Sequence, residues 1–137
     1  MPKAVNPPIF LDFAHGGPYV AAVLRRLVDG LSARPEITGV AVISGEGLVI
    51  QQALGPEADP DALAALAMTL GRHGSELGES VGLGALQTLV LEFEDGPAVM
   101  TRYRDDTALV LLARPEADLG ELLYLLRRQR GAINDLL

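Results

Sequence analysis

The chain has 137 residues, a length that fits a single domain with its own hydrophobic core. It contains no cysteine and carries a net charge of −7, which excludes a disulfide framework and a thiolate zinc site and argues against nucleic acid or an anionic membrane as a partner. No apolar run approaches the roughly 18 residues of a membrane span, and the first residues do not resemble a signal peptide, so we expect a cytoplasmic protein without membrane insertion.

The N-terminal residues 1–16 contain three prolines and no hydrophobic period. We expect them to form an extended arm, in which residues 9–11 provide one short segment able to pair as a strand. Residues 17–137 show no internal repeat and no composition break that would mark a linker. We therefore predict one folded domain over residues 17–137.

The first predicted helix starts at Pro18, with Gly17 as its cap position, and ends before Pro35. Its apolar residues follow helical spacing: Val20, Val23, Leu24, Leu27, Val28 and Leu31. A hairpin follows this helix. Residues 39–43 are apolar on both faces, residues 44–47 form a turn with two glycines, and residues 48–53 form the return strand.

The second helix has the clearest start signal in the chain. Asp59 can cap it, Pro60 takes the first helical position, Asp61 adds a favourable charge, and the helix is predicted to run to about Gly78. Three kinds of residue occupy different sides of this helix. The leucine stripe consists of Leu63, Leu66, Leu70 and Leu77, the small-residue stripe of Ala64, Ala67, Gly71, Gly74 and Gly78, and the polar side of Arg72, His73, Glu76 and Glu79.

The small-residue stripe requires an explanation, because each helical glycine costs about 1 kcal/mol relative to alanine. We expect the leucine stripe to seat the helix on a sheet and the small stripe to let a second copy of the helix approach across a two-fold axis. Two alternatives stay open. The small stripe could pack on this chain's own sheet or first helix, or the helix could end at Gly71.

Three strands and a final helix complete the chain. The strands are predicted over residues 85–94, 98–104 and 108–113, joined by tight turns. The last helix begins at Asp118, with Glu121 three residues later in a capping-box arrangement. Its apolar stripe contains Leu119, Leu122, Leu123, Leu126 and Ile133.

Tight turns between strands imply an antiparallel sheet of five strands in an α+β fold. The strands at 39–44 and 108–113 are apolar on both faces, so we place them in the centre, with helices on both faces of the sheet. The strand at 85–94 is expected at an edge. An unprotected edge invites pairing with another chain.

Two segments carry a family resemblance: ITGVAVISGEGLVI at residues 37–50, and TALVLLA at 107–113 followed by EADLG at 116–120. The chain resembles the roadblock domain family, which includes dynein light chains, endosomal scaffold subunits and bacterial gliding and polarity proteins of the MglB type. The resemblance implies the order α-β-β-α-β-β-β-α, with two helices on one sheet face and the middle helix on the other. It also implies dimers that pair the third strand and the middle helix, and bacterial relatives associated with Ras-like small GTPases.

The small stripe, the edge strand and the resemblance together predict a homodimer interface. The predicted interface residues are Ala64, Ala67, Met68, Gly71, Gly74, Ser75, Gly78, Leu86, Thr88, Val90 and Glu92. The polar side of the second helix supplies the candidate contacts to another partner: Arg72, His73, Glu76 and Glu79.

The sequence offers no reactive cluster. The only lysine is Lys3, so no P-loop exists, and neither His15 nor His73 belongs to an H-E-x-x-H zinc motif. We expect no nucleophile elbow, cofactor, metal site or enzymatic activity. The leading hypothesis is a homodimeric regulator or scaffold of a Ras-like small GTPase, one that stimulates hydrolysis without a catalytic centre of its own. The alternatives are a structural light-chain-like adaptor without a GTPase, and a small-molecule sensor with a pocket between sheet and helix.

Overall fold

The computed structural model describes residues 17–136, so the predicted arm and its pairing segment lie outside the described residues. The elements, in chain order, are α2 (Pro18–Ser32), β1 (Ile37–Ile43), β2 (Val49–Ala53), α3 (Pro60–Ser80), β3 (Thr88–Phe93), β4 (Gly96–Arg102), the short 3-10 turn η1 (Arg104–Asp106), β5 (Ala108–Ala113) and α4 (Leu119–Leu136). This order confirms the predicted α-β-β-α-β-β-β-α arrangement.

The five strands form one antiparallel sheet in the order β2-β1-β5-β4-β3. The two strands that are apolar on both faces, β1 and β5, lie side by side in the interior of the sheet, as predicted. The apolar side chains on both faces of these strands must be buried, and helices cover both faces only in the interior of the sheet. The prediction that β3 lies at an edge is also confirmed, with β2 at the opposite edge.

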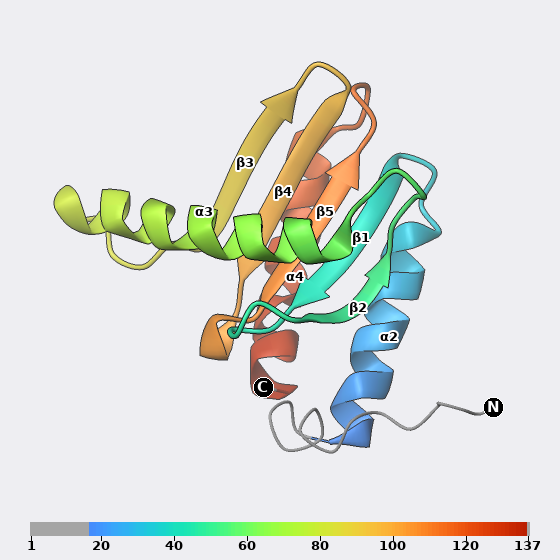
Figure 1. Ribbon diagram of the computed structural model, residues 1–137, viewed down its shortest axis with the longest axis horizontal. Coiled ribbons are helices and arrows are strands. Elements are labelled where there is room, and N and C mark those ends of the chain that lie inside the picture. Colours follow the sequence, from blue (N-terminus) through green and yellow to red (C-terminus); the bar gives the residue numbers. More distant parts are fainter. Residues whose placement is uncertain (1–16, 137) are drawn as a thin grey trace.

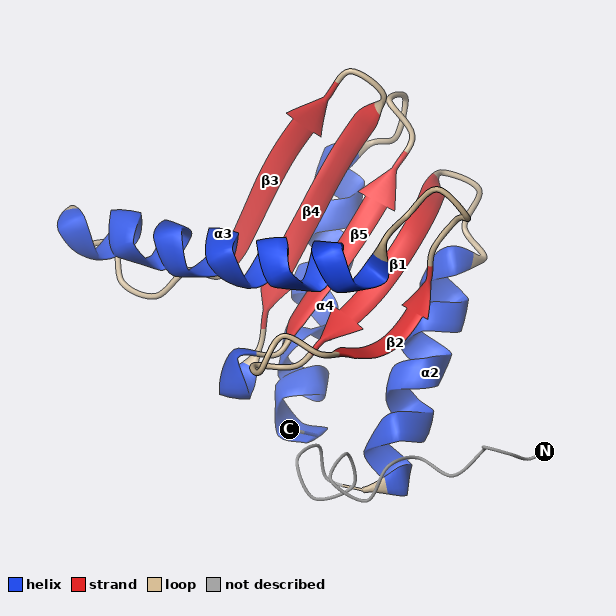
Figure 2. Ribbon diagram, viewed as in Figure 1, coloured by secondary structure: helices blue, strands red, loops and turns tan. Residues whose placement is uncertain are grey.

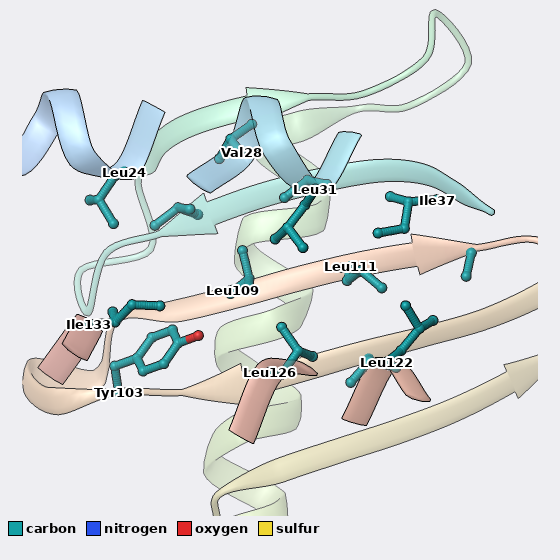
Figure 3. Packing of buried hydrophobic residues seen from close by; sticks show 14 of the residues in the cluster. Leu24, Val28, Leu31, Ile37, Tyr103, Leu109, Leu111, Leu122, Leu126 and Ile133 are labelled. Carbon is teal, nitrogen blue, oxygen red and sulfur yellow. The ribbon is translucent and has the colours of Figure 1, made fainter. Parts of the chain in front are cut away.

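Three layers result, with α2 and α4 on one face of the sheet and α3 crossing the strands on the other (Figures 1 and 2). Between the sheet and the helix pair lies the main hydrophobic core (Figure 3). Leu24 of α2, Leu122 of α4, and Leu109 and Leu111 of β5 are fully buried there. The apolar stripes predicted for the first and last helices therefore both face this core.

The helix starts follow the local signals in the sequence. Gly17 caps α2 with Pro18 at its first position, and the Asp59 carboxylate accepts a hydrogen bond from the Ala62 amide at 3.2 Å. The Asp118 carboxylate likewise accepts from the Glu121 amide at 3.1 Å. The Glu121 side chain accepts a bond from Arg34, so it links α4 to the segment that follows α2.

Candidate interaction surface

The small-residue stripe of α3 faces this chain's own sheet. Ala64 and Ala67 are 0% and 6% exposed, and Gly71 is also buried. A Cβ atom added to Gly71 would lie 3.5 Å from the terminal methyl of Met100 on β4. The alternative that the sequence left open, packing on this chain's own sheet, is the observed arrangement of these three residues. Long side chains from the strands fill the space that small residues leave on the helix.

The later residues of the stripe also find their packing partners within the protomer. A Cβ atom on Gly74 would lie 2.9 Å from a methyl of Leu86, and one on Gly78 would lie 3.0 Å from the Gly84 carbonyl oxygen. Ser75 accepts a hydrogen bond from Arg102 at 2.7 Å. These glycines let the segment between α3 and β3 fold back against the helix. Gly74, Ser75 and Gly78 are half-buried, and their contact with a second copy stays a prediction.

Met68 is half-buried near the turn between β1 and β2. A Cβ atom added to Gly47 in that turn would lie 3.6 Å from the Met68 side chain. Met68 thus lies beside the hairpin turn, and its role in an interface between copies stays a prediction.

The leucine stripe of α3 points outward instead. Leu66, Leu70 and Leu77 are 61%, 39% and 70% exposed, while Leu63 is half-buried. The small-residue stripe packs on the sheet, and most of the leucine stripe is exposed, which is the reverse of the arrangement that the sequence suggested. Helical spacing shows that a helix has two apolar sides, but the volume available above the sheet decides which side is buried.

Strand β3 presents an edge beside these leucines. It pairs only with β4, so the backbone groups on its other side are unpaired within the described part of the chain. Thr88 and Val90 are half-buried, and Glu92 is exposed. Val90 packs on the core under α4, and these three residues alternate with Leu89, Leu91 and Phe93, which face the α3 side.

An apolar groove of about 220 Å³ runs between α3 and the sheet. Its lining is entirely apolar: Leu63, Leu66, Ala67, Leu70, Leu89, Leu91, Phe93, Ala98, Met100, Val110 and Leu112. Phe93 is 63% exposed at the end of this groove. We call Leu63, Leu66 and Leu70 of α3, with Leu89, Leu91 and Phe93 of β3, the α3–β3 surface. A contiguous exposed apolar surface of this kind is typical of a protein interaction site.

The polar side of α3 is exposed, as the sequence predicts for partner contacts. Arg72, His73, Glu76 and Glu79 all face solvent. The His73 ring nitrogen Nδ1 lies 3.0 Å from a Glu76 carboxylate oxygen. Exposed pairs of this type contribute little to stability, so these side chains can change partners without loss of the fold.

Two arginines that sequence reasoning missed hold α3 and α4 to the sheet. The Arg102 guanidinium, on β4, donates to the Gly71 carbonyl, to Ser75 and to the Asp106 carboxylate at 3.3, 2.7 and 2.5 Å. The Arg130 guanidinium, on α4, donates to the Thr101 hydroxyl at 2.5 Å and to the Arg102 carbonyl. The only signal for Arg102 was a charge at the end of a mostly apolar strand.

One spacing that is typical of hydrolases occurs at the end of α3. Gly78, Ser80 and Gly82 have the G-x-S-x-G spacing of a nucleophile elbow, but they lie at the end of α3 and not at a strand-to-helix turn. The Ser80 hydroxyl donates to the Leu77 carbonyl at 2.7 Å. Within residues 17–136 no three metal-binding side chains gather, and no helix is both long and apolar enough to cross a membrane.

The family model of the Roadblock/LC7 domain matches residues 24–113, about two-thirds of the chain. The chain belongs to the Roadblock/LC7 domain family. A search of curated proteins finds no match. The match covers α3, β3 and the groove between them, whereas α4 lies beyond it. The α3–β3 surface is therefore built by the part of the chain that defines the Roadblock/LC7 domain.

Solved structures share this Roadblock/LC7 fold. A Roadblock/LC7 domain from Streptomyces avermitilis is 29% identical, with a TM-score of 0.67 over 81% of this chain and 91% of that one. MglB from Myxococcus xanthus is 16% identical, with a TM-score of 0.77 over 85% and 88%. An MglB described as having a tetrameric arrangement is 17% identical, with a TM-score of 0.68 over 99% and 96%.

Proposed function

We propose that this Roadblock/LC7 protein is a non-catalytic cytoplasmic homodimer that binds a Ras-like small GTPase as a regulator or scaffold. The observation that carries the proposal is the α3–β3 surface, where an apolar groove lies directly beside an unpaired strand edge. Leu66 and Phe93 are more than half exposed there. Large apolar side chains in such a position are most readily explained by a protein partner.

A second copy is the partner that best fits the edge. Two β3 strands related by a two-fold axis can pair antiparallel and extend the sheet across both protomers. Thr88, Val90 and Glu92 remain in the proposed interface because they belong to β3. Leu66, Leu70 and Phe93 join it because they are exposed beside β3, together with the half-buried residues Met68, Gly74, Ser75 and Gly78 of α3. The tetrameric arrangement of one MglB with this fold supports self-association of such domains.

The proposal of a GTPase partner rests on the resemblance to bacterial roadblock proteins. In the dimer, the exposed residues Arg72, His73, Glu76 and Glu79 of two α3 helices form a mixed-charge face that a GTPase can contact. Within residues 17–136 no three metal-binding side chains gather, and we propose that any stimulation of hydrolysis acts through the shape of the bound GTPase.

Sedimentation velocity of the purified chain tests the dimer. Leu70→Asp and Phe93→Asp place a charge in the apolar surface, so each is expected to give monomers at concentrations where the unmodified chain is dimeric. Tyr124→Asp is the matched control, because Tyr124 is 62% exposed on α4, on the opposite side of the sheet. A chain that sediments as a monomer at every concentration contradicts the dimer.

Titration of candidate GTPases, each loaded with GDP or with a GTP analogue, tests the second half of the proposal. We expect nucleotide-dependent binding that Arg72→Glu weakens. Capture of larger proteins without any GTPase, independent of nucleotide, would instead support the adaptor alternative. The groove does not favour the small-molecule sensor, because its lining offers no polar side chain to orient a ligand.

A further inference from the structure

The backbone of β3 directs its polar groups alternately towards β4 and towards the free edge of the sheet. The Arg102 amide donates to the Gln87 carbonyl at 2.9 Å, which makes these two residues a hydrogen-bonded pair that continues the β3–β4 register. Such pairs alternate along an antiparallel ladder. The backbone groups that point towards the free edge therefore belong to Thr88, Val90 and Glu92.

The other residues of β3 place three large apolar side chains on the α3 face. Leu89, Leu91 and Phe93 all line the groove between α3 and the sheet. Leu89 and Leu91 are half-buried, whereas Phe93 is 63% exposed. Gln87, the next residue back along the chain on this side of the ladder, is polar and exposed. A strand added at the edge therefore has to cover three apolar side chains and leave Gln87 in solvent.

These two constraints select one register for a pair of β3 strands. Outward backbone groups of both strands meet when Leu89, Val90 or Leu91 lies on the two-fold axis. With Val90 on the axis, Phe93 faces Gln87 of the partner subunit, and with Leu89 on the axis, Leu91 faces that glutamine. With Leu91 on the axis, Leu89 faces Phe93 of the partner subunit. Only this last register of the three lets the apolar side chains of the α3 face meet one another and nothing polar.

Helix α3 extends far enough to cover the added strand. It crosses the strands and projects past β3 (Figure 1). Gly71 of α3 packs near Met100 of β4, and Leu77 follows six residues later, a rise of roughly 9 Å along the helix. Neighbouring strands lie roughly 4.8 Å apart, so this rise carries Leu77 from β4 past β3 to the place of the next strand. Leu77 belongs to the leucine stripe and is 70% exposed.

We propose that Phe93 of the partner subunit packs into the α3–β3 groove of each protomer, between Leu89 and Leu77, with Leu91 of both chains on the two-fold axis. The inference rests on the proposed homodimer and deepens it, because the groove of one protomer is incomplete without a side chain of the other. Leu89 and Phe93 of the partner subunit form a non-hydrogen-bonded pair, in which side chains approach most closely. Pairs of aromatic and aliphatic side chains in this arrangement stabilise a sheet.

The chain has no cysteine, so single-cysteine variants of the full chain test the register. Leu91→Cys places two thiols across the axis in a pair whose Cα atoms lie roughly 4.5 Å apart, and we expect disulfide-linked dimers on mild oxidation. Leu89→Cys is the matched control on the same face of the same strand, and Val90→Cys tests the neighbouring register. Both should link at least about tenfold more slowly, because their Cα atoms are more than roughly 7 Å from their symmetry mates.

A mixture of two variants tests the proposed contact itself. Leu89→Cys mixed with Phe93→Cys should give a disulfide between the two different chains, while neither variant links with itself. Faster linkage of Leu89→Cys or Val90→Cys than of Leu91→Cys assigns another register and overturns the proposal. A dimer in sedimentation that none of the single-cysteine variants links also overturns the register, although the proposed self-association then stands.

The contact with α3 is tested by the dissociation constant of the dimer in sedimentation velocity. Leu77→Ala should raise this constant about tenfold, because it removes an apolar side chain from the covered part of the interface. Leu48→Ala is the control, since Leu48 is 46% exposed beside β2, at the opposite edge of the sheet, and it should leave the constant unchanged. An unchanged constant for Leu77→Ala overturns the contact between α3 and Phe93 of the partner subunit. A chain that is monomeric at every concentration overturns the proposed dimer together with this inference.

Discussion

The two faces of the sheet differ in how completely their helices close them. On the α2–α4 face, fifteen of the described residues form one buried cluster, whereas the α3 face buries six. Two helices cover one face of the five-stranded sheet, whereas a single helix crosses the strands on the other face (Figure 1). On that second face Phe93 of β3 stays exposed and Leu91 is only half-buried. The first face therefore provides stability, and the second retains apolar area for association.

The largest expected effect comes from adjacent residues of β5 that point to opposite faces. Leu111 is fully buried under α2 and α4, so Leu111→Ala should lower the free energy of unfolding by about 2–5 kcal/mol. Leu112 is half-buried beside the α3–β3 groove, and Leu112→Ala should cost only about 1 kcal/mol. Urea unfolding at low protein concentration measures both values. Equal losses would contradict the difference between the faces.

The next effect concerns the attachment of α3 to the sheet. Arg102→Ala removes hydrogen bonds to Ser75, to the Gly71 carbonyl and to Asp106, and we expect a loss of about 2 kcal/mol. Arg72→Ala on the exposed side of the same helix is the control and should change stability by less than about 0.5 kcal/mol. Hydrogen exchange should show faster exchange in α3 for Arg102→Ala. Unchanged protection of α3 would mean that its apolar contacts suffice.

A smaller effect is expected in the closed core, where the Tyr103 ring points into the cluster (Figure 3). Its hydroxyl is buried without a hydrogen-bond partner, so Tyr103→Phe should stabilise the protein by about 1 kcal/mol at neutral pH. Burial raises the pKa of Tyr103 to about 12, above the value of about 10 in an unfolded chain.

The same tyrosine makes the effect depend on pH. The unfolded chain ionises first, so the contribution of neutral Tyr103 is complete below pH 10 and is lost as the pH rises towards 12. The advantage of Tyr103→Phe should therefore grow between these values in thermal unfolding experiments. A constant difference across the range would show that the hydroxyl is solvated in the folded state.

The smallest effect concerns the half-buried ion pair of Arg34 and Glu36, just before β1. A hydrogen bond from its own backbone N–H and one from Arg34 lower the pKa of Glu36. The ionised Glu36 side chain therefore stabilises the fold above the usual pKa of glutamate. This stabilisation is lost as the pH falls through the lowered pKa of Glu36. Glu36→Gln should thus lower the melting temperature slightly at pH 7 and leave it unchanged at pH 3. A decrease at both values would indicate a steric cause.

Much of the fold could be predicted from short stretches of sequence. Proline and aspartate at helix starts, glycines in turns and the doubly apolar strands β1 and β5 act through local backbone preferences and burial, which neighbouring residues reveal. Less of the candidate site could be predicted from the sequence. The β3 edge follows from strand order, but Arg102 and Arg130 form contacts with residues about 30 positions away, which no local pattern indicates.

The residue pattern alone specifies that α3 has two apolar sides, one of leucines and one of small residues. Which side is buried depends on side chains from distant strands, so it is set by the packing of the folded chain. Met100 reaches towards Gly71, and Leu86 reaches towards Gly74, so the small residues face inward and the leucines outward. Helical periodicity describes the side chains of α3 alone, whereas close packing depends on the combined side-chain volume of the helix and the sheet.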